Sequence, residues 1–260
     1  MRVALICHHD NPLNREALPR FLASEAELAG IIVITETGGR MWQRLRFEWK
    51  RSGIRMLDVL AFRFFYRLRQ SARDREWVAR EVDAIQATYP PVRDVRVHET
   101  TDPNDEGTRA FLQDLRPDLT IARCKTLLTP EVFEVPALGT YVLHPGICPE
   151  YRNAHGCFWA LARRDLDRVG ATLLRIDTGV DTGPVYAYYT ADIDEARESH
   201  VVIQHRVVFD NLRAIAHDLR RIVARQAVPI DVDGRRSAAW GQPRLTDYVR
   251  WKRAARRGGS

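Results

Sequence analysis

The sequence predicts an α/β fold built on a mainly parallel, Rossmann-like sheet. The main observation is that short apolar runs of strand length alternate with amphipathic stretches of helical length. The first two runs, residues 3–7 and the β-branched residues 30–35, flank a helical stretch at 14–28. This order is typical of strand–helix–strand units, whose crossovers are right-handed and whose buried strands are almost continuously apolar.

The alternation resumes after residue 85. Strands are predicted at 92–97, 118–122, 140–143, 170–176 and 185–190, and helices at 106–115, 130–133 and 154–164. A longer amphipathic helix is expected over 200–225, and a basic tail that packs down on the body from residue 234 onward.

Residues 40–85 interrupt the alternation with a helical insertion. Apolar side chains recur there at spacings of three and four residues, at Ile54, Leu57, Ala61, Phe64 and Leu68. Arginines fill the intervening positions, so that twelve residues between 40 and 80 are basic and only four are acidic. We expect residues 1–190 to form a catalytic domain that contains this insertion, with a C-terminal helix and basic tail over 191–260.

The composition is that of a globular protein, with 45% hydrophobic residues, 28% charged residues and a formal net charge of +6. The four cysteines are too few for a disulfide framework in a chain of this length, which predicts a reducing compartment. The run at 3–7 reaches His8 too soon for a secretory signal, and no apolar run is long enough to span a bilayer. We therefore expect a cytoplasmic protein.

Residues suited to catalysis are concentrated between 140 and 185. His144 follows a predicted strand directly, and Pro145 and Gly146 end that strand abruptly. Asp181 stands between Gly179 and Gly183, where the backbone can approach a ligand closely. Because ligands collect beyond the carboxyl ends of parallel strands, we expect this histidine and this aspartate in one crevice.

These residues belong to a longer pattern. It begins as His-Pro-Gly-x-x-Pro-x-Tyr-Arg at 144–152, continues with His155 before a predicted helix, and ends as Gly-Val-Asp-Thr-Gly-Pro at 179–184. The pattern is similar to the core of formyltransferases that use 10-formyltetrahydrofolate, a family that includes the glycinamide ribonucleotide, methionyl-tRNA and sugar N-formyltransferases. The resemblance runs from residue 1 to about 190 and leaves out the insertion.

The resemblance implies transfer of a formyl group from 10-formyltetrahydrofolate to an amine. His144 would stabilise the oxyanion at the formyl carbon, Asp181 would keep that histidine charged or relay the proton of the amine, and His155 matches the second histidine of the family. It also implies that the pterin ring lies against two loops, at the residues Arg123, Lys125, Leu127, Ile176, Gly179, Val180 and Thr182.

One position departs from the family pattern. The family places an asparagine two residues before the catalytic histidine, and this chain has Val142 there. Loss of one oxyanion donor typically costs roughly 10²–10³ in rate. Three interpretations stay open: Asn153 supplies the donor, the chain carries out a different acyl-transfer or hydrolytic reaction, or it is a binding or regulatory protein without catalysis.

The acceptor is expected to be a small-molecule amine, such as a sugar amine. Residues 8–15 read HHDNPLNR where the purine-pathway enzymes have a glycine-rich phosphate loop, which argues against glycinamide ribonucleotide. The chain is also short for the RNA-binding domain of the tRNA enzyme, which argues against tRNA. We expect Asn11, Asn14 and Arg152 to contact the acceptor, although Arg152 could instead pair with Glu150 or another acidic residue.

Other interpretations use some of the same residues. A zinc site at His144, Cys148, His155 and Cys157 matches no common ligand spacing, so no metal is expected. Cys148 could act as a nucleophile beside His144, or be a small buried residue. The basic region at 40–80 could contact an anionic surface or another subunit, for example in a homodimer, and nucleic acid is disfavoured as a partner.

Overall fold

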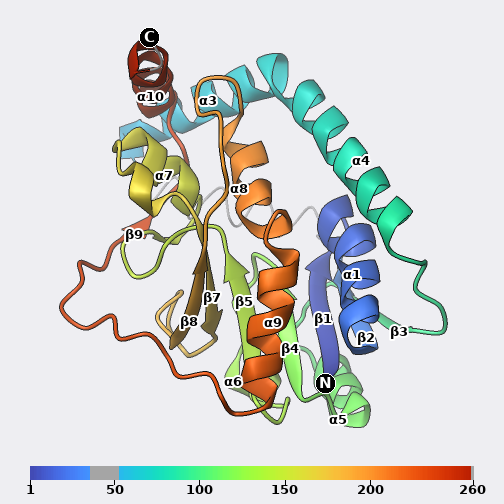
Figure 1. Ribbon diagram of the computed structural model, residues 1–260. Coiled ribbons are helices and arrows are strands. Elements are labelled where there is room, and N and C mark those ends of the chain that lie inside the picture. Colours follow the sequence, from blue (N-terminus) through green and yellow to red (C-terminus); the bar gives the residue numbers. More distant parts are fainter. Residues whose placement is uncertain (36–52, 259–260) are drawn as a thin grey trace.

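The computed structural model describes residues 1–35 and 53–258, and a seven-stranded sheet lies at its centre. The strand order is β3-β2-β1-β4-β5-β7-β8 (Figure 1). The first five strands are parallel, and β7 and β8 are antiparallel to their neighbours. This confirms the predicted fold class. The strands are β1 (Arg2–His8), β2 (Glu27–Ile34), β3 (Arg96–Thr100), β4 (Leu119–Arg123), β5 (Thr140–His144), β7 (Ala171–Arg175) and β8 (Val185–Tyr189).

Helices cover both faces of the sheet. On one face lie α1 (Leu18–Glu25), α4 (Ser71–Thr88), α8 (His200–Phe209) and α9 (Leu212–Val223), and on the other lie α5 (Glu106–Leu115) and α6 (Pro130–Phe133). Successive residues of β1 enter these two cores alternately, since Leu5 packs with the first set of helices and Ile6 with the second. Burial on both faces explains why the central strands are almost continuously apolar.

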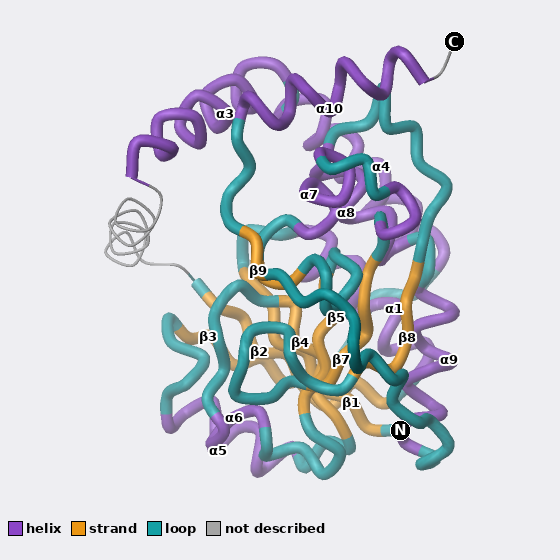
Figure 2. Tube along the Cα trace, turned by 90° about the vertical axis from the view of Figure 1, so that its left-hand side faces the viewer, coloured by secondary structure: helices purple, strands orange, loops and turns teal. Residues whose placement is uncertain are grey.

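Three helices lie beyond the carboxyl ends of the strands. They are α3 (Met56–Arg69), α7 (Gly156–Ala162) and α10 (Leu245–Gly258), and Figure 2 shows α3 and α10 together at one end of the molecule. A two-stranded pairing of β6 (Arg152–Asn153) with β9 (Ala239–Trp240) lies near α7 (Figure 1). Short helical turns occur at η1 (Leu13–Ala17), η2 (Gly53–Arg55) and η3 (Leu166–Arg168).

Several predicted boundaries were wrong. The first helical stretch ends at Glu25, because Leu28 already pairs with β1 as part of β2. The strand predicted at 92–97 forms at 96–100 instead. The long helix at 200–225 is broken after Phe209, where the side-chain amide of Asn211 donates to the main-chain oxygens of Thr190 and Val207.

The predicted basic tail contains a packed helix. In α10, Tyr248, Trp251 and Ala255 repeat at spacings of three and four and are buried, with Trp251 fully enclosed. The sequence prediction missed this stripe because five basic residues surround it. None of the described helices is long and apolar enough to cross a membrane.

The described part of the insertion is helical, as predicted, and consists of α3 and α4. Its predicted apolar stripe, however, faces solvent: Ile54 and Phe64 are 83% and 66% exposed. A second apolar set, Met56, Val59 and Phe62, packs α3 onto the body. The part of the insertion at 40–52 lies outside the described residues.

Candidate active site

His144 is the last residue of β5, at the edge of the sheet where parallel strands end. Its side chain is only 7% exposed. The Nε2 atom lies 2.8 Å from the main-chain oxygen of Tyr151. Because a carbonyl oxygen can only accept, the hydrogen must be on Nε2. The other ring nitrogen, Nδ1, faces Oδ2 of Asp181 at 3.4 Å.

The loop after β5 folds back tightly at Gly146. A Cβ atom there would lie 2.4 Å from the oxygen of Tyr151 and 2.7 Å from Nε2 of His144, so no larger residue fits. Thr172 on β7 holds the same loop, since its hydroxyl donates to the oxygen of Gly146 at 2.6 Å and accepts from the N–H of Cys148 at 3.0 Å. The neighbouring strand thus holds the start of the loop that carries Tyr151, whose carbonyl binds His144.

Asp181 lies in the loop between β7 and β8, with a left-handed φ of 52°. Its side chain is 15% exposed, and the oxygen that faces His144 also accepts the main-chain N–H of Asn153 at 2.7 Å. Arg152 adds a second link between the two loops, because its Nη1 donates to the oxygen of Val180 at 2.8 Å. The aspartate is therefore positioned by the histidine loop as well as by its own.

The Asp181 loop is also closed on itself. Asp177 accepts the main-chain N–H of Gly179 at 3.0 Å and the hydroxyl of Thr182 at 2.8 Å. A Cβ atom at Gly179 would lie 1.9 Å from the Thr182 hydroxyl oxygen, so the turn requires glycine. Thr182 thus shapes the loop with its hydroxyl, which is committed to Asp177.

Trp240 holds the histidine loop from the other side, and sequence reasoning missed it. Its main-chain oxygen accepts the side-chain N–H of Asn153 at 2.5 Å, and its indole N–H donates to the oxygen of Glu150 at 2.8 Å. The indole ring stacks on Tyr151 and on Trp159, with centroid distances of 5.7 and 4.9 Å. No local signal in the sequence marked Trp240, because its partners lie about ninety residues earlier.

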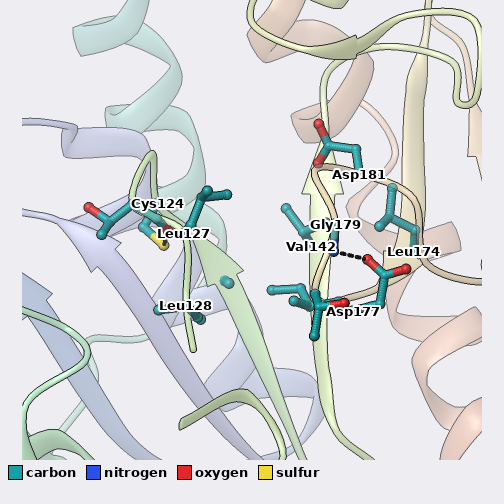
Figure 3. Close-up of a pocket in the computed structure, with 12 residues that line it drawn as sticks. Cys124, Leu127, Leu128, Val142, Leu174, Asp177, Gly179 and Asp181 are labelled. Atoms are coloured by element: carbon teal, nitrogen blue, oxygen red, sulfur yellow. Dashed lines mark hydrogen bonds between the residues drawn. The ribbon is translucent and has the colours of Figure 1, made fainter. Parts of the chain in front are cut away.

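A cavity opens beside the His144–Asp181 pair. Cys124, Leu127 and Leu128 form one wall, and Figure 3 shows them across the cavity from Val142 and Asp181. The full lining is Ala122, Cys124, Thr126, Leu127, Leu128, Val142, Leu174, Ile176, Asp177, Thr178, Gly179 and Asp181. The two loops predicted to bind a ligand therefore do face the same space.

The predicted ligand-binding residues divide into two groups. Leu127, Ile176 and Gly179 line the cavity, whereas Arg123, Lys125, Val180 and Thr182 are not among its lining residues. The guanidinium of Arg123 donates instead to the main-chain oxygen of Leu143 and to the side chain of Asn14, and burial lowers its pKa to about 10. The main-chain N–H of Lys125 donates to His8. The apolar lining residues Leu128 and Leu174 were missed because they read as ordinary core.

The residues predicted for the acceptor are mostly engaged with the protein. Asn14 is buried against Arg123, and the side chain of Asn11 accepts the main-chain N–H of Asn14 at 3.2 Å. Arg152 donates to Ser237 as well as to the Asp181 loop. The alternative pairing of Arg152 with Glu150 was wrong, since Glu150 accepts from Nε and Nη2 of Arg235 at 2.9 and 2.7 Å.

His155 precedes α7 with a left-handed φ of 57°. Burial, followed by the positive charge of Lys125, lowers the pKa of His155 to about 4, so its ring is neutral at pH 7. Its ring centroid lies 5.8 Å from that of His200, and Nδ1 is 3.5 Å from the side-chain nitrogen of Gln204. His155 can therefore offer a neutral hydrogen-bonding group but no charge.

The cysteine and metal alternatives find no support in the geometry. Cys148 is 1% exposed, and burial, followed by the charge of Asp181, raises the pKa of its thiol. Cys157 is fully buried and directs its sulfur to the main-chain oxygen of Gly170. Within residues 1–35 and 53–258, no three His, Cys, Asp or Glu side chains gather in a way that could hold a metal ion.

Comparison with known proteins gives a family match. Residues 75–219, which include His144, Asn153, His155 and Asp181, match the family described as formyl transferase. The methionyl-tRNA formyltransferase of Chlorobium chlorochromatii (strain CaD3) is 28% identical over 151 residues, covering 58% of this chain and 46% of that protein. That of Kosmotoga olearia is 42% identical over 82 residues, covering 31% and 25%. The chain spans about a quarter to a half of the length of the curated relatives it matches.

Solved structures share the fold at low sequence identity. The phosphoribosylglycinamide formyltransferase from Anaplasma phagocytophilum has a TM-score of 0.56 and 13% identity, covering 94% of this chain and 99% of that one. A sugar N-formyltransferase from Shewanella sp. FDAARGOS_354 has a TM-score of 0.54 and 13% identity, covering 98% and 87%.

Proposed function

The chain belongs to the formyl transferase family, and on that premise we propose that it transfers a formyl group from 10-formyltetrahydrofolate to the amine of a small molecule. The observation that carries the proposal is the paired arrangement of His144 and Asp181 at the rim of a cavity. A bond forms from the acceptor nitrogen to the formyl carbon, the bond from that carbon to the folate nitrogen breaks, and one proton passes from the amine to the folate nitrogen.

The pair is arranged to hold one proton. With the hydrogen of Nε2 directed to Tyr151, the Nδ1 atom of a neutral His144 would present a lone pair to the carboxylate of Asp181. Two acceptors at 3.4 Å repel each other unless a proton lies between them. We infer that His144 and Asp181 share this proton between Nδ1 and Oδ2, so that the positive charge of the imidazole ring can stabilise an oxyanion at the formyl carbon.

The cavity suits a flat heteroaromatic ring with polar edges. Leu128, Val142 and Leu174 give apolar surface for its faces, and the carboxylates of Asp177 and Asp181 can accept hydrogen bonds from N–H groups at its rim. We propose that a reduced folate places its pterin ring there, which would bring its formyl group next to His144.

Asn153 remains the proposed replacement for the missing family asparagine. Its amide nitrogen carries two hydrogens, of which one is directed to Trp240, and its main-chain N–H already binds Asp181. Val142 borders the cavity but can donate nothing. The second amide hydrogen of Asn153 is therefore the donor that we propose for the developing oxyanion.

The acceptor is proposed to enter on the side of His155. This side is positively charged, because Lys125 and Arg63 both lie near enough to lower the pKa of that histidine. A small amine that also carries an anionic group would be attracted there. Sugar amines are one acceptor class to screen, together with other small amines.

Calorimetric titration with a stable 10-formyl folate analogue tests the proposal. We expect micromolar binding to the wild-type chain, weaker binding to Asp181→Ala, and wild-type binding to Asp192→Ala, which removes an exposed carboxylate elsewhere. The wild-type chain is then given 10-formyltetrahydrofolate and screened with amines for release of tetrahydrofolate. Failure to bind the analogue would exclude folate as the donor, and binding without transfer to any amine would favour a binding protein.

A further inference from the structure

The outward side of α3 is an exposed apolar surface. Among the described residues, ten large hydrophobic side chains are exposed, and half of them are clustered here. We call this surface the α3 face; its apolar residues are Ile54 in the preceding turn η2 and Leu57, Leu60, Phe64 and Leu68 in α3, with exposures of 83%, 59%, 38%, 66% and 64%. Clusters of this kind on a protein surface usually mark an interaction site.

The α3 face is not the side of the helix that packs on the protein core. The opposite side of α3 already packs on the body through Met56, Val59 and Phe62, which are 1–4% exposed. Leu57, Phe64 and Leu68 are seven and four residues apart, so they lie in one row along a helix of 14 residues. The row is about 17 Å long at 1.5 Å per residue and can lie flat on an extended surface.

Positive charge surrounds this row. Segments 53–69 and 245–258 together carry nine basic residues and two acidic ones, an excess of seven that is greater than the net charge of the whole chain. Arg67 is exposed one helical turn from Phe64, and α10, which packs beside α3, presents exposed arginines at positions 253 and 256. One of the two acidic residues, Asp58, is hydrogen-bonded to Thr246 between these helices.

We propose that the α3 face binds the surface of an anionic lipid bilayer. An amphipathic helix with an apolar row and an arginine-rich margin is the arrangement that inserts at the level of the lipid headgroups. A second copy of the chain would bring two arginine-rich margins together, which is repulsive. Nucleic acid would pair with the arginines but leave the apolar row in water.

Binding in this way would place the membrane beside the active site. Arg63 belongs to the same helix and lies close enough to His155 to lower the pKa of its imidazole. The sheet lies on the other side of α3 from the proposed bilayer, and Figure 2 shows α3 and α10 along one end of the molecule. No residue of α3 lines the cavity that contains Leu127 and Asp181.

Vesicle co-sedimentation tests the proposal. The full chain is mixed with vesicles of phosphatidylcholine alone, or with added phosphatidylserine, at low and high salt. We expect binding to the anionic vesicles that weakens as salt rises, because the arginines contribute through a screened interaction. The double variant Leu57→Glu, Phe64→Glu should lower the partition coefficient at least about tenfold, and Arg67→Gln about fivefold.

The matched control is Val228→Glu, which makes the same kind of change at a side chain 79% exposed outside α3 and α10. It should bind vesicles like the wild type. Thermal melting and binding of the folate analogue show that all variants are folded, since none of these positions lines the cavity. The proposal is overturned if the wild type does not bind anionic vesicles, or if the double variant binds them equally well. It is also overturned if sedimentation shows that the wild type is a dimer and that the double variant alone is a monomer.

Discussion

Replacing Asp181 by asparagine tests the proton-sharing arrangement at the centre of the site. The asparagine oxygen can still accept the main-chain N–H of Asn153, which lies 2.7 Å from the native carboxylate oxygen. The negative charge that faces Nδ1 of His144 at 3.4 Å is lost. The exchange therefore changes the charge of the pair with little change in shape.

The distance sets the expected size of the effect. Two unit charges 3.4 Å apart attract by about 5 kcal/mol at an effective dielectric constant of about 20. The pair retains some contact with water, since the side chains are 7% and 15% exposed, so about half of this value is a reasonable estimate. Loss of about 2–3 kcal/mol of stabilisation of the charged imidazole ring, on which the proposed oxyanion depends, corresponds to roughly a 10²-fold fall in kcat.

Two measurements check this reasoning. Nitrogen-15 NMR of labelled histidine should show His144 protonated on both ring nitrogens in the wild type and only on Nε2 in Asp181→Asn. Formyl transfer to an amine found in the screen should fall by the stated factor, while Asp192→Asn, the same change at an exposed site, should have no effect. A singly protonated His144 in the wild type, or an Asp181→Asn enzyme of full activity, would refute the shared proton.

Three further predictions follow from the same geometry. Asn153→Ala should lower kcat about 10²–10³-fold if its amide is the oxyanion donor. Adding Val142→Asn to that variant should restore part of the lost kcat. An Asn153→Ala enzyme within threefold of wild type in kcat would argue against this role. Trp240→Ala should lower kcat more than it raises KM, because Trp240 positions Asn153 and Tyr151 without lining the cavity. Trp240→Phe keeps the ring stacking and should recover much of the activity. Equal kcat in both variants and the wild type would contradict the positioning role. Acid should destabilise the fold through His155: its folded pKa of about 4 lies below the ordinary value of 6.5, so the unfolded chain takes up the proton first and stability falls as pH drops from about 6.5 toward 4. Urea unfolding at pH 6.5 and pH 5 should show a loss of stability that is smaller by roughly 2 kcal/mol in His155→Gln than in the wild type, and an unchanged pH dependence in that variant would place the effect elsewhere.

The sequence by itself determined the fold class, and it predicted that His144 and Asp181 lie together. Alternating apolar runs predicted the parallel sheet because strands buried on both faces must be apolar along their whole length. His144 was predictable because it stands at the carboxyl end of a parallel strand. The glycine-rich turn marked Asp181 as a candidate, but β7 runs antiparallel to β5, so it is the folding of the loop after β7 that brings Asp181 to His144.

Only the tertiary structure decided which side chains complete the site. Trp240 reaches the histidine loop from about ninety residues away, and the lining residues Leu128 and Leu174 have the pattern of ordinary core residues. Contacts of this kind depend on how loops pack against each other, and loop packing produces no hydrophobic periodicity that can be recognised in the sequence.

The two sides of α3 show the same division. The spacing of its apolar residues predicted a helix, but both sides of that helix are apolar, and periodicity does not say which one is buried. In the folded chain, Met56, Val59 and Phe62 are buried in the core, whereas Leu57 and Phe64 are exposed to solvent. Local sequence determines what an element is, whereas the placement of its faces depends on neighbours that are distant in the chain.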